Sequence, residues 1–148
     1  MRTLIKAGLL ATMLCTSAAW AQTASPVGLW KTIDDETGKP KALVRITEEN
    51  GALQGKIEKL FRGPNEEQNP VCNKCSDSRK NQPIVGMTIV SGLKKDGNEY
   101  TGGEILDPAK GKVYKSKATL RDGGQKLEVR GYIGAPMFGR SQVWQREQ

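Results

Sequence analysis

The chain of 148 residues contains no histidine, only three cysteines and few aromatic side chains. Histidine is the side chain most often used for acid–base catalysis at neutral pH. A CxxC motif that attaches haem needs a histidine after its second cysteine, and Ser76 follows Cys75 here. A zinc site would need carboxylates such as Asp77 to complete it. We therefore expect no metal ion and no cofactor.

Motifs of common enzymes are also missing. The chain has neither a nucleophile elbow nor a phosphate-binding glycine loop. Glu104 and Asp107 form a candidate carboxylate pair near the end of one predicted strand. A solvent-facing position explains Glu104, and Asp107 precedes Pro108 and fits the start of a turn. The sequence thus favours a protein that is not an enzyme.

Long apolar runs are absent beyond the first 21 residues. Arg2 and Lys6 precede a short apolar segment, and Ala19-Trp20-Ala21 supplies small residues for cleavage. The apolar segment is too short to span a bilayer of about 30 Å. Cys15 does not fit a lipid anchor, because Leu14 before it is not small. We predict a signal peptide over residues 1–21 and a periplasmic or secreted mature protein over 22–148.

Acidic side chains are outnumbered, and the formal net charge is +7. Without Arg2 and Lys6, 21 basic and 16 acidic side chains remain. The lysines are scattered and form no run, which is typical of a solvated surface; the alternative is attraction to anionic envelope surfaces. Export and the absence of an aromatic and basic platform argue against nucleic acid.

Turn signals rich in glycine, asparagine and aspartate divide the chain, and the segments between them alternate in polarity as strands do. No apolar period of 3.6 residues is long enough for an ordinary helix. The alternation predicts strands at 28–34, 41–48, 52–61, 86–93, 99–106, 112–120, 126–133 and 140–147. Strands of this number, linked as hairpins in a single domain, predict an all-β up-and-down antiparallel barrel or a sandwich.

One long loop interrupts the strands at residues 62–83 and contains Cys72 and Cys75. In an oxidising compartment the pair favours a structural disulfide that stiffens the loop, worth about 2 kcal/mol at most. Thiol–disulfide exchange is the alternative, although the strand-to-helix setting of thioredoxin-like proteins is missing.

The first and last predicted strands each contain a tryptophan, Trp30 and Trp144. Closure of a barrel brings these strands together. We expect Gly28, Trp30 and Arg140 to close the barrel, with the Arg140 guanidinium on the Trp30 ring in a cation–π contact of about 0.5–2 kcal/mol.

Several motifs together resemble the exported bacterial family called domain of unknown function 2147, over essentially all of the mature chain. The Gly-x-Trp motif at the start of the mature chain, together with an arginine late in the chain, is also similar to the lipocalin and calycin pattern. The matching motifs are Gly28-Leu29-Trp30-Lys31-Thr32, Cys72-Asn73-Lys74-Cys75, Arg79-Lys80-Asn81-Gln82-Pro83-Ile84-Val85-Gly86-Met87, Gly102-Gly103-Glu104-Ile105-Leu106-Asp107-Pro108, Val129-Arg130-Gly131-Tyr132-Ile133-Gly134 and Gly139-Arg140. The resemblance implies an eight-stranded lipocalin-like barrel, but no established activity that carries over.

Lipocalin-like barrels usually bind small apolar molecules, so by analogy of fold we expect such a ligand in the barrel or at its mouth. The residues expected to line the interior or rim are Asn81, Gln82, Met87, Tyr132, Met137 and Phe138. Asn81 and Gln82 fit equally well as residues that cap the long loop through backbone hydrogen bonds. A second hypothesis is an envelope interaction protein that acts through its outer surface. A third is a redox protein that uses Cys72 and Cys75.

Overall fold

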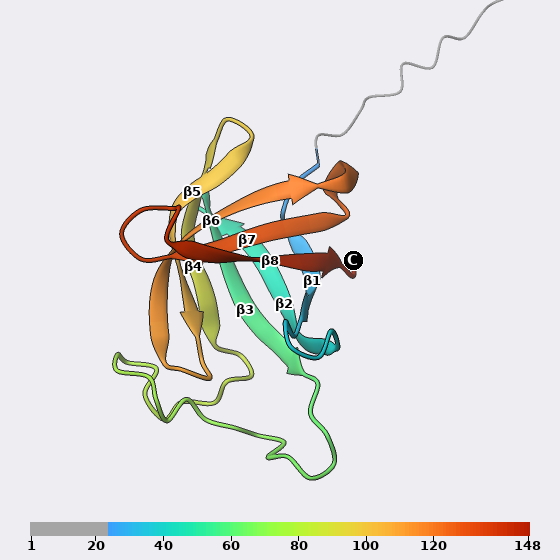
Figure 1. Ribbon diagram of the computed structural model, residues 1–148, viewed down its shortest axis with the longest axis vertical. Helices are drawn as coiled ribbons and strands as arrows, with labels where there is room; N and C mark the ends of the chain where they lie inside the picture. Colours follow the sequence, from blue (N-terminus) through green and yellow to red (C-terminus); the bar gives the residue numbers. More distant parts are fainter. Residues whose placement is uncertain (1–23) are drawn as a thin grey trace, which may run out of the picture.

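The computed structural model describes residues 24–148, so the predicted signal peptide lies outside the described residues. All eight predicted strands are present, and the closed antiparallel barrel is confirmed (Figure 1). Their ends lie within three residues of the predicted ones. The strands are β1 (Gly28–Ile33), β2 (Pro40–Glu49), β3 (Ala52–Leu60), β4 (Thr88–Asp96), β5 (Glu99–Asp107), β6 (Lys112–Arg121), β7 (Lys126–Tyr132) and β8 (Gly139–Arg146), and a 3₁₀ turn, η1 (Asp122–Gly124), precedes β7.

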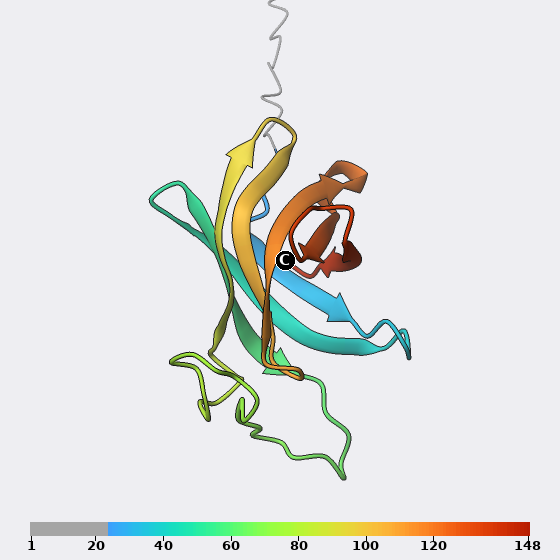
Figure 2. The same cartoon turned by 60° about the vertical axis from the view of Figure 1, so that its left-hand side comes forward.

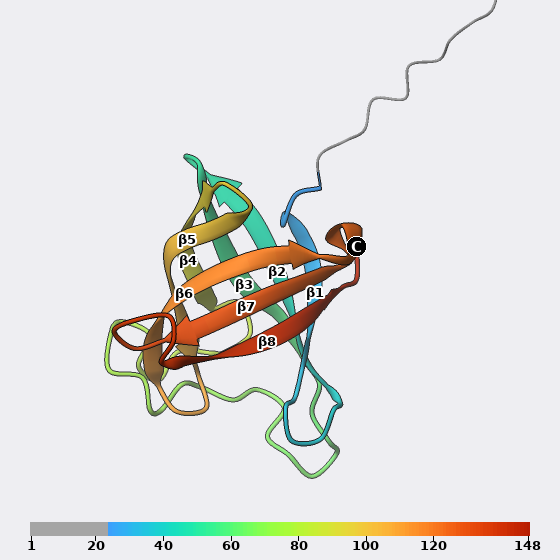
Figure 3. The ribbon, with the colours of Figure 1, turned by 45° about the horizontal axis from the view of Figure 1, so that its top comes forward.

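The barrel has two ends, which differ in what lies across them. We call the closed end the one that holds Gly28 and Arg146, together with the turns after β2, β4 and β6. We call the open end the opposite one, where the segments 34–39, 61–87, 108–111 and 133–138 connect the strands. Figures 1 and 3 show the segment 133–138 (red) projecting on the side away from the C-terminus.

The closed end is shut by Trp30 and the chain around it. The Trp30 ring is fully buried, and its indole N–H donates to the Pro26 carbonyl oxygen at 2.8 Å. Gly28 has φ of +144°, and a Cβ there would lie 2.5 Å from the Gln148 carbonyl oxygen. Only glycine therefore lets the C-terminal residues pass so close to β1. The prediction that Gly28 and Trp30 contribute to closure agrees with this packing.

The arginine beside Trp30 is Arg146, not Arg140 as predicted. The Arg146 guanidinium lies 4.4 Å from the centre of the Trp30 ring, and the two residues are register partners. Arg140 lies at the open end, where its side chain is 71% exposed and pairs with Asp35 at 3.7 Å. Five residues of β8 lie between the two arginines, which places them at opposite ends of the barrel.

Inside the barrel, large side chains fill the part nearest the closed end. Burial of each large apolar side chain there stabilises the fold by about 1.5–3 kcal/mol. The largest fully buried side chains include Trp30, Val44, Ile46, Leu93, Leu127 and Trp144.

The seam between β1 and β8 is joined only near the closed end. The β7–β8 ladder has seven register pairs, whereas β1 and β8 share two, Trp30 with Arg146 and Lys31 with Gln145. Towards the open end the two strands are therefore bridged by side chains rather than by a continuous ladder.

The long loop lies beyond the ends of the strands, at the open end of the barrel (Figure 2). Val90 and Ile105 face inward as a register pair, so their neighbours Ile89 and Leu106 face outward. Both outward residues are nevertheless buried, in one cluster with Cys72 and Cys75. The loop thus extends the hydrophobic core, which also contains the inward-facing Val90, over the outer face of β4 and β5.

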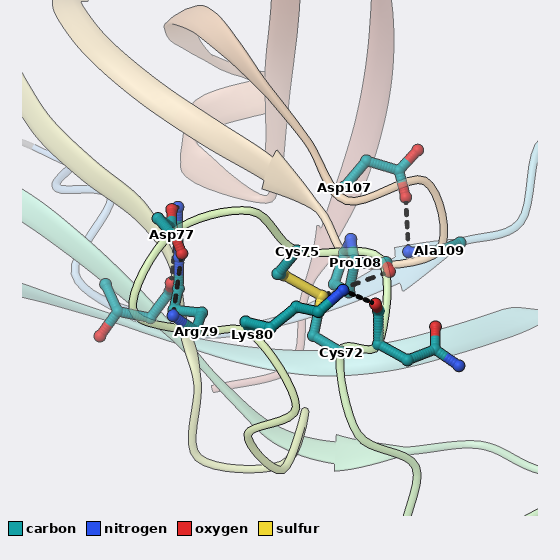
Figure 4. The surroundings of a disulfide bond; sticks show 10 residues. Cys72, Cys75, Asp77, Arg79, Lys80, Asp107, Pro108 and Ala109 are labelled. Carbon is teal, nitrogen blue, oxygen red and sulfur yellow. Dashed lines mark hydrogen bonds and ion pairs between the residues drawn. A yellow bond between two sulfur atoms is a disulfide. The ribbon is translucent and has the colours of Figure 1, made fainter.

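The disulfide expected between Cys72 and Cys75 is present (Figure 4). The Cys72 sulfur lies 3.6 Å from the Pro108 carbonyl oxygen in the turn between β5 and β6. In the same turn a Cβ on Gly111, whose φ is +67°, would meet the Lys74 carbonyl oxygen. The CxxC segment is therefore pressed against this turn.

Candidate ligand site at the open end of the barrel

The inner face of β8 carries a polar series that runs from the core to the open end. The Trp144 indole N–H donates to the side-chain oxygen of Gln142 at 3.3 Å. The Gln142 amide donates to the Asp35 carboxylate at 3.2 Å, and Arg140 pairs with the same carboxylate oxygen. Because Arg140, Gln142 and Trp144 are two residues apart, all three face inward. Together with Asp35 they bridge the seam where the β1–β8 ladder has ended.

Small residues occupy the inner face beside this series. Ser116 pairs in register with Gly103 on one side and with Gly131 on the other, and Gly131 pairs with Arg140. The Ser116 side chain is fully buried, and its hydroxyl has no hydrogen-bond partner in the described structure. A buried hydroxyl without a partner is costly, and such a group in a native protein calls for an explanation.

Ile105 and Tyr114 lie next to these residues, closer to the open end. They are register partners, and a Cβ added at Gly131 would lie 3.4 Å from Ile105 and 3.5 Å from Tyr114. Both side chains are half-buried although they face inward. Solvent therefore reaches the inner face of the barrel at this end, and we call the set Ile105, Tyr114, Ser116, Gly131, Arg140 and Gln142 the open-end site.

Three of the predicted ligand residues lie in the long loop instead. Gln82 lines a groove of about 490 Å³ between the end of the loop and the start of β4. Met87 borders the same groove, but its side chain is buried in the hydrophobic core. Asn81 has φ of +60°, its N–H donates to the Cys72 carbonyl oxygen, and the Cys72 N–H donates to that of Gln82. The backbone of this pair therefore holds the loop closed at Cys72, as the capping alternative describes.

The other three lie at the open end but outside the barrel. Tyr132 follows the inward-facing Gly131 and so faces outward. Met137 lines a groove of about 390 Å³ on the outer surface of β6, β7 and β8. Phe138 is 69% exposed. None of the six predicted residues belongs to the open-end site.

Sequence analysis missed most of the open-end site for identifiable reasons. Alternation along β8 places Gln142 inward together with Trp144, and this signal was available in the sequence. Ser116 carries no sequence signal, because its lack of a partner depends on the glycines of two neighbouring strands. Asp35 lies in a turn, and only the closed barrel brings it to Gln142.

Electrostatic perturbation is strongest in the long loop rather than at the open-end site. The Arg79 guanidinium donates to the Asp77 carboxylate and lowers the pKa of Asp77 to about 2. Arg79 also donates to the Thr88 carbonyl oxygen at 2.9 Å, which ties the loop to the start of β4. The described residues contain no cluster of metal-ligating side chains. Residues 24–148 also contain no helix long and apolar enough to cross a membrane.

The closed eight-stranded barrel, shut at one end by the Gly-x-Trp strand, defines a lipocalin-like protein. Residues 28–146 match the family described as an uncharacterized protein conserved in bacteria, domain of unknown function 2147, and the chain belongs to this family. The fold is similar to that of protein HP1028 from Helicobacter pylori, which belongs to the lipocalin family. The TM-score is 0.71, the identity is 19% and the comparison covers 85% of each chain. No curated protein shows significant similarity.

Proposed function

We propose that this protein is an exported, non-enzymatic binding protein that holds a small, partly apolar molecule at the open-end site. The observation that carries the proposal is the arrangement of the inner face. Large side chains fill the barrel near the closed end, whereas the inner wall nearer the open end carries the small residues Ser116 and Gly131. A barrel of eight strands is wide enough for one small ligand.

The residues of the open-end site indicate the chemistry of the ligand. Ile105 and Tyr114 offer apolar surface, and their partial exposure leaves that surface for a ligand to cover. Arg140 and Gln142 offer hydrogen-bond donors at the mouth, and Arg140 meets Asp35 only at 3.7 Å and is largely exposed. The arrangement suits a molecule with an apolar body and one polar or anionic group.

The redox alternative has less support. Cys72 is fully buried and Cys75 is 1% exposed. Thiol–disulfide exchange requires a thiolate to reach a sulfur atom in line, and burial at both cysteines opposes this approach. We therefore assign the disulfide a structural role.

Titration with 1-anilinonaphthalene-8-sulfonate, an apolar anion whose fluorescence rises away from water, tests the proposed function. The wild type is expected to bind one molecule. Gly131→Val is expected to weaken binding at least tenfold, because its methyl groups project between Ile105 and Tyr114. Thr119→Val is the matched control, since Thr119 lies on the outer face of β6.

Equal affinities of the wild type and Gly131→Val for the probe would contradict the proposal. The same titration is run on Met137→Ser/Phe138→Ser, which removes exposed apolar side chains outside the barrel. Loss of probe binding in that variant alone would place the probe on the outer surface and would also contradict the proposal. Urea unfolding of each variant verifies that the fold is retained.

A further inference from the structure

The loop between β7 and β8 exposes three large apolar side chains together. Ile133 is 62% exposed, Met137 is 77% exposed and Phe138 is 69% exposed. They are the most exposed of the large hydrophobic residues in residues 24–148, and all belong to the segment 133–138, which we call the apolar loop. The apolar loop projects from the barrel away from the C-terminus (Figures 1 and 3). Exposed apolar groups gathered in one place mark an interaction site.

The apolar loop is held in this conformation by its own backbone and by one arginine. The Ile133 N–H donates to the Phe138 carbonyl oxygen at 3.2 Å, and the Phe138 N–H donates to that of Ala135 at 2.9 Å. The Arg130 guanidinium donates to the carbonyl oxygens of Pro136 at 2.6 Å and of Gly139 at 3.2 Å. An ordered backbone that leaves its apolar side chains in water gains little burial within the fold. The loop is therefore built to present these side chains to something outside the protein.

Basic side chains surround the apolar loop. Lys115 is the register partner of Tyr132, Lys112 begins β6 at the same end, and Arg140 is the second residue after the loop. Among the described residues, neither Arg130 nor Lys115 has a carboxylate within ion-pair distance.

Most acidic groups near the apolar loop are paired, including Glu99 and Glu128, which line a groove with Met137 and pair with Lys117 and Arg121. Asp35 pairs with Arg140, and Asp107 accepts from the Ala109 N–H in the neighbouring turn. Glu104 lies across from Lys115 in register and contributes to the raised pKa of Arg79. The loop itself contains no charged side chain. Arg130 and Lys115 thus lie beside the apolar tip as positive charges without an ion-pair partner among the described residues.

We propose that the apolar loop inserts Ile133, Met137 and Phe138 into the interface of an anionic lipid bilayer. A protruding tip of apolar side chains within a basic surround matches the two attractions of peripheral membrane binding, apolar burial below the headgroups and attraction to their charge. A folded protein partner or a second copy would need a complementary hollow for a convex tip. Docking through this loop turns the open end of the barrel towards the membrane.

Sedimentation with vesicles tests the proposal. The protein is taken as the expressing cell produces it, and mass spectrometry verifies that wild type and variants share one N-terminus. Vesicles contain phosphatidylcholine alone or with about one third phosphatidylglycerol. The wild type is expected to bind the anionic vesicles and to be released by salt. Met137→Ser/Phe138→Ser is expected to bind at least tenfold more weakly, and Lys115→Gln about fivefold more weakly.

The matched control is Val71→Ser/Val85→Ser, which removes two exposed valines of the long loop, 44% and 43% exposed. This control is expected to bind as the wild type does. A Phe138→Trp variant adds a direct readout, because the native indoles within residues 24–148, Trp30 and Trp144, are buried, and the new indole is exposed to lipid. Its emission is expected to shift to the blue on anionic vesicles.

Three results would overturn the proposal. The first is a wild type that fails to bind anionic vesicles or binds uncharged vesicles equally. The second is equal binding by wild type and Met137→Ser/Phe138→Ser. The third is a dimer in analytical ultracentrifugation that this variant abolishes while vesicle binding stays unchanged, because the loop would then serve a second copy of the chain.

Discussion

Arg146 stacks on Trp30 and joins the last strand of the barrel to the first. Its guanidinium lies 4.4 Å from the ring centre and donates to the carbonyl oxygens of Gly124 at 2.7 Å and Val27 at 3.0 Å. One side chain thus connects β8, the segment before β1 and the turn before β7. The short β1–β8 ladder lies at the same place, so this contact secures the seam of the barrel.

Replacing Arg146 by alanine is expected to lower the free energy of unfolding by about 2–4 kcal/mol. The change removes the cation–π contact and several charge-assisted hydrogen bonds. Arg140→Ala is the control and is expected to cost less than about 0.5 kcal/mol, because its ion pair is exposed. Urea unfolding followed by tryptophan fluorescence measures both variants. An equal loss of unfolding free energy in Arg146→Ala and Arg140→Ala would contradict the role of Arg146 in closing the barrel.

The disulfide is expected to act as a local staple. Replacing Cys72 and Cys75 by serine is expected to lower the free energy of unfolding by about 2 kcal/mol, since the bond closes a very short chain segment. The far-ultraviolet circular dichroism spectrum of the barrel is expected to stay the same. Efficient reduction of the wild-type bond by a dithiol oxidoreductase, without unfolding, would instead favour the redox alternative.

Ser116→Ala is expected to raise the free energy of unfolding by about 1 kcal/mol. The hydroxyl is buried without a partner, so its removal relieves a desolvation cost. Thr32→Val is the matched control, because the Thr32 hydroxyl is also buried but donates to the Ala42 carbonyl oxygen at 3.5 Å. This control is expected to be neutral or destabilising. A destabilised Ser116→Ala variant would indicate that the hydroxyl has a partner in solution.

The pH dependence of stability is expected to report the Asp77–Arg79 pair. In the folded protein the pKa of Asp77 is about 2, below the usual value of 3.8, because Arg79 and a backbone N–H donate to the carboxylate. The ionised form is thus favoured by folding, and its contribution is present above about pH 4 and is lost as the pH falls towards 2. Melting temperatures of wild type and Asp77→Asn are expected to differ at pH 6 and to converge near pH 2. A constant difference over this range would contradict the assignment.

The strands could be predicted from the sequence because alternation and turn residues are local signals. In β7, Leu127 and Val129 alternate with polar residues and are buried, whereas Ile133, the next apolar residue in this alternation, lies past the end of the strand and is 62% exposed. The arginine at the seam could not be predicted in the same way. Arg140, Trp144 and Arg146 all occupy inward positions on β8, so alternation does not distinguish the two arginines. Only the register between β1 and β8 does, and it is set by closure of the whole barrel.

Most residues of the open-end site could not be predicted from the sequence, for a related physical reason. Asn81, Gln82 and Met87 were expected to line the interior or rim of the barrel. The backbone of Asn81 and Gln82 is instead hydrogen-bonded to Cys72 within the loop, and Met87 is buried in the hydrophobic core. Gln142 and Asp35 meet across the seam although they lie far apart in the chain. Such a contact is specified by closure rather than by any local pattern.

Native mass spectrometry tests the central claim, that the open-end site holds a small molecule, most directly. The protein is isolated under mild conditions from its own host, as the wild type and as Gly131→Val. We predict an additional mass of a few hundred daltons on the wild type, which is lost on denaturation and depleted in the variant. The account would be contradicted if both proteins showed only the mass of the polypeptide in repeated preparations. It would also be contradicted if both carried an equal additional mass.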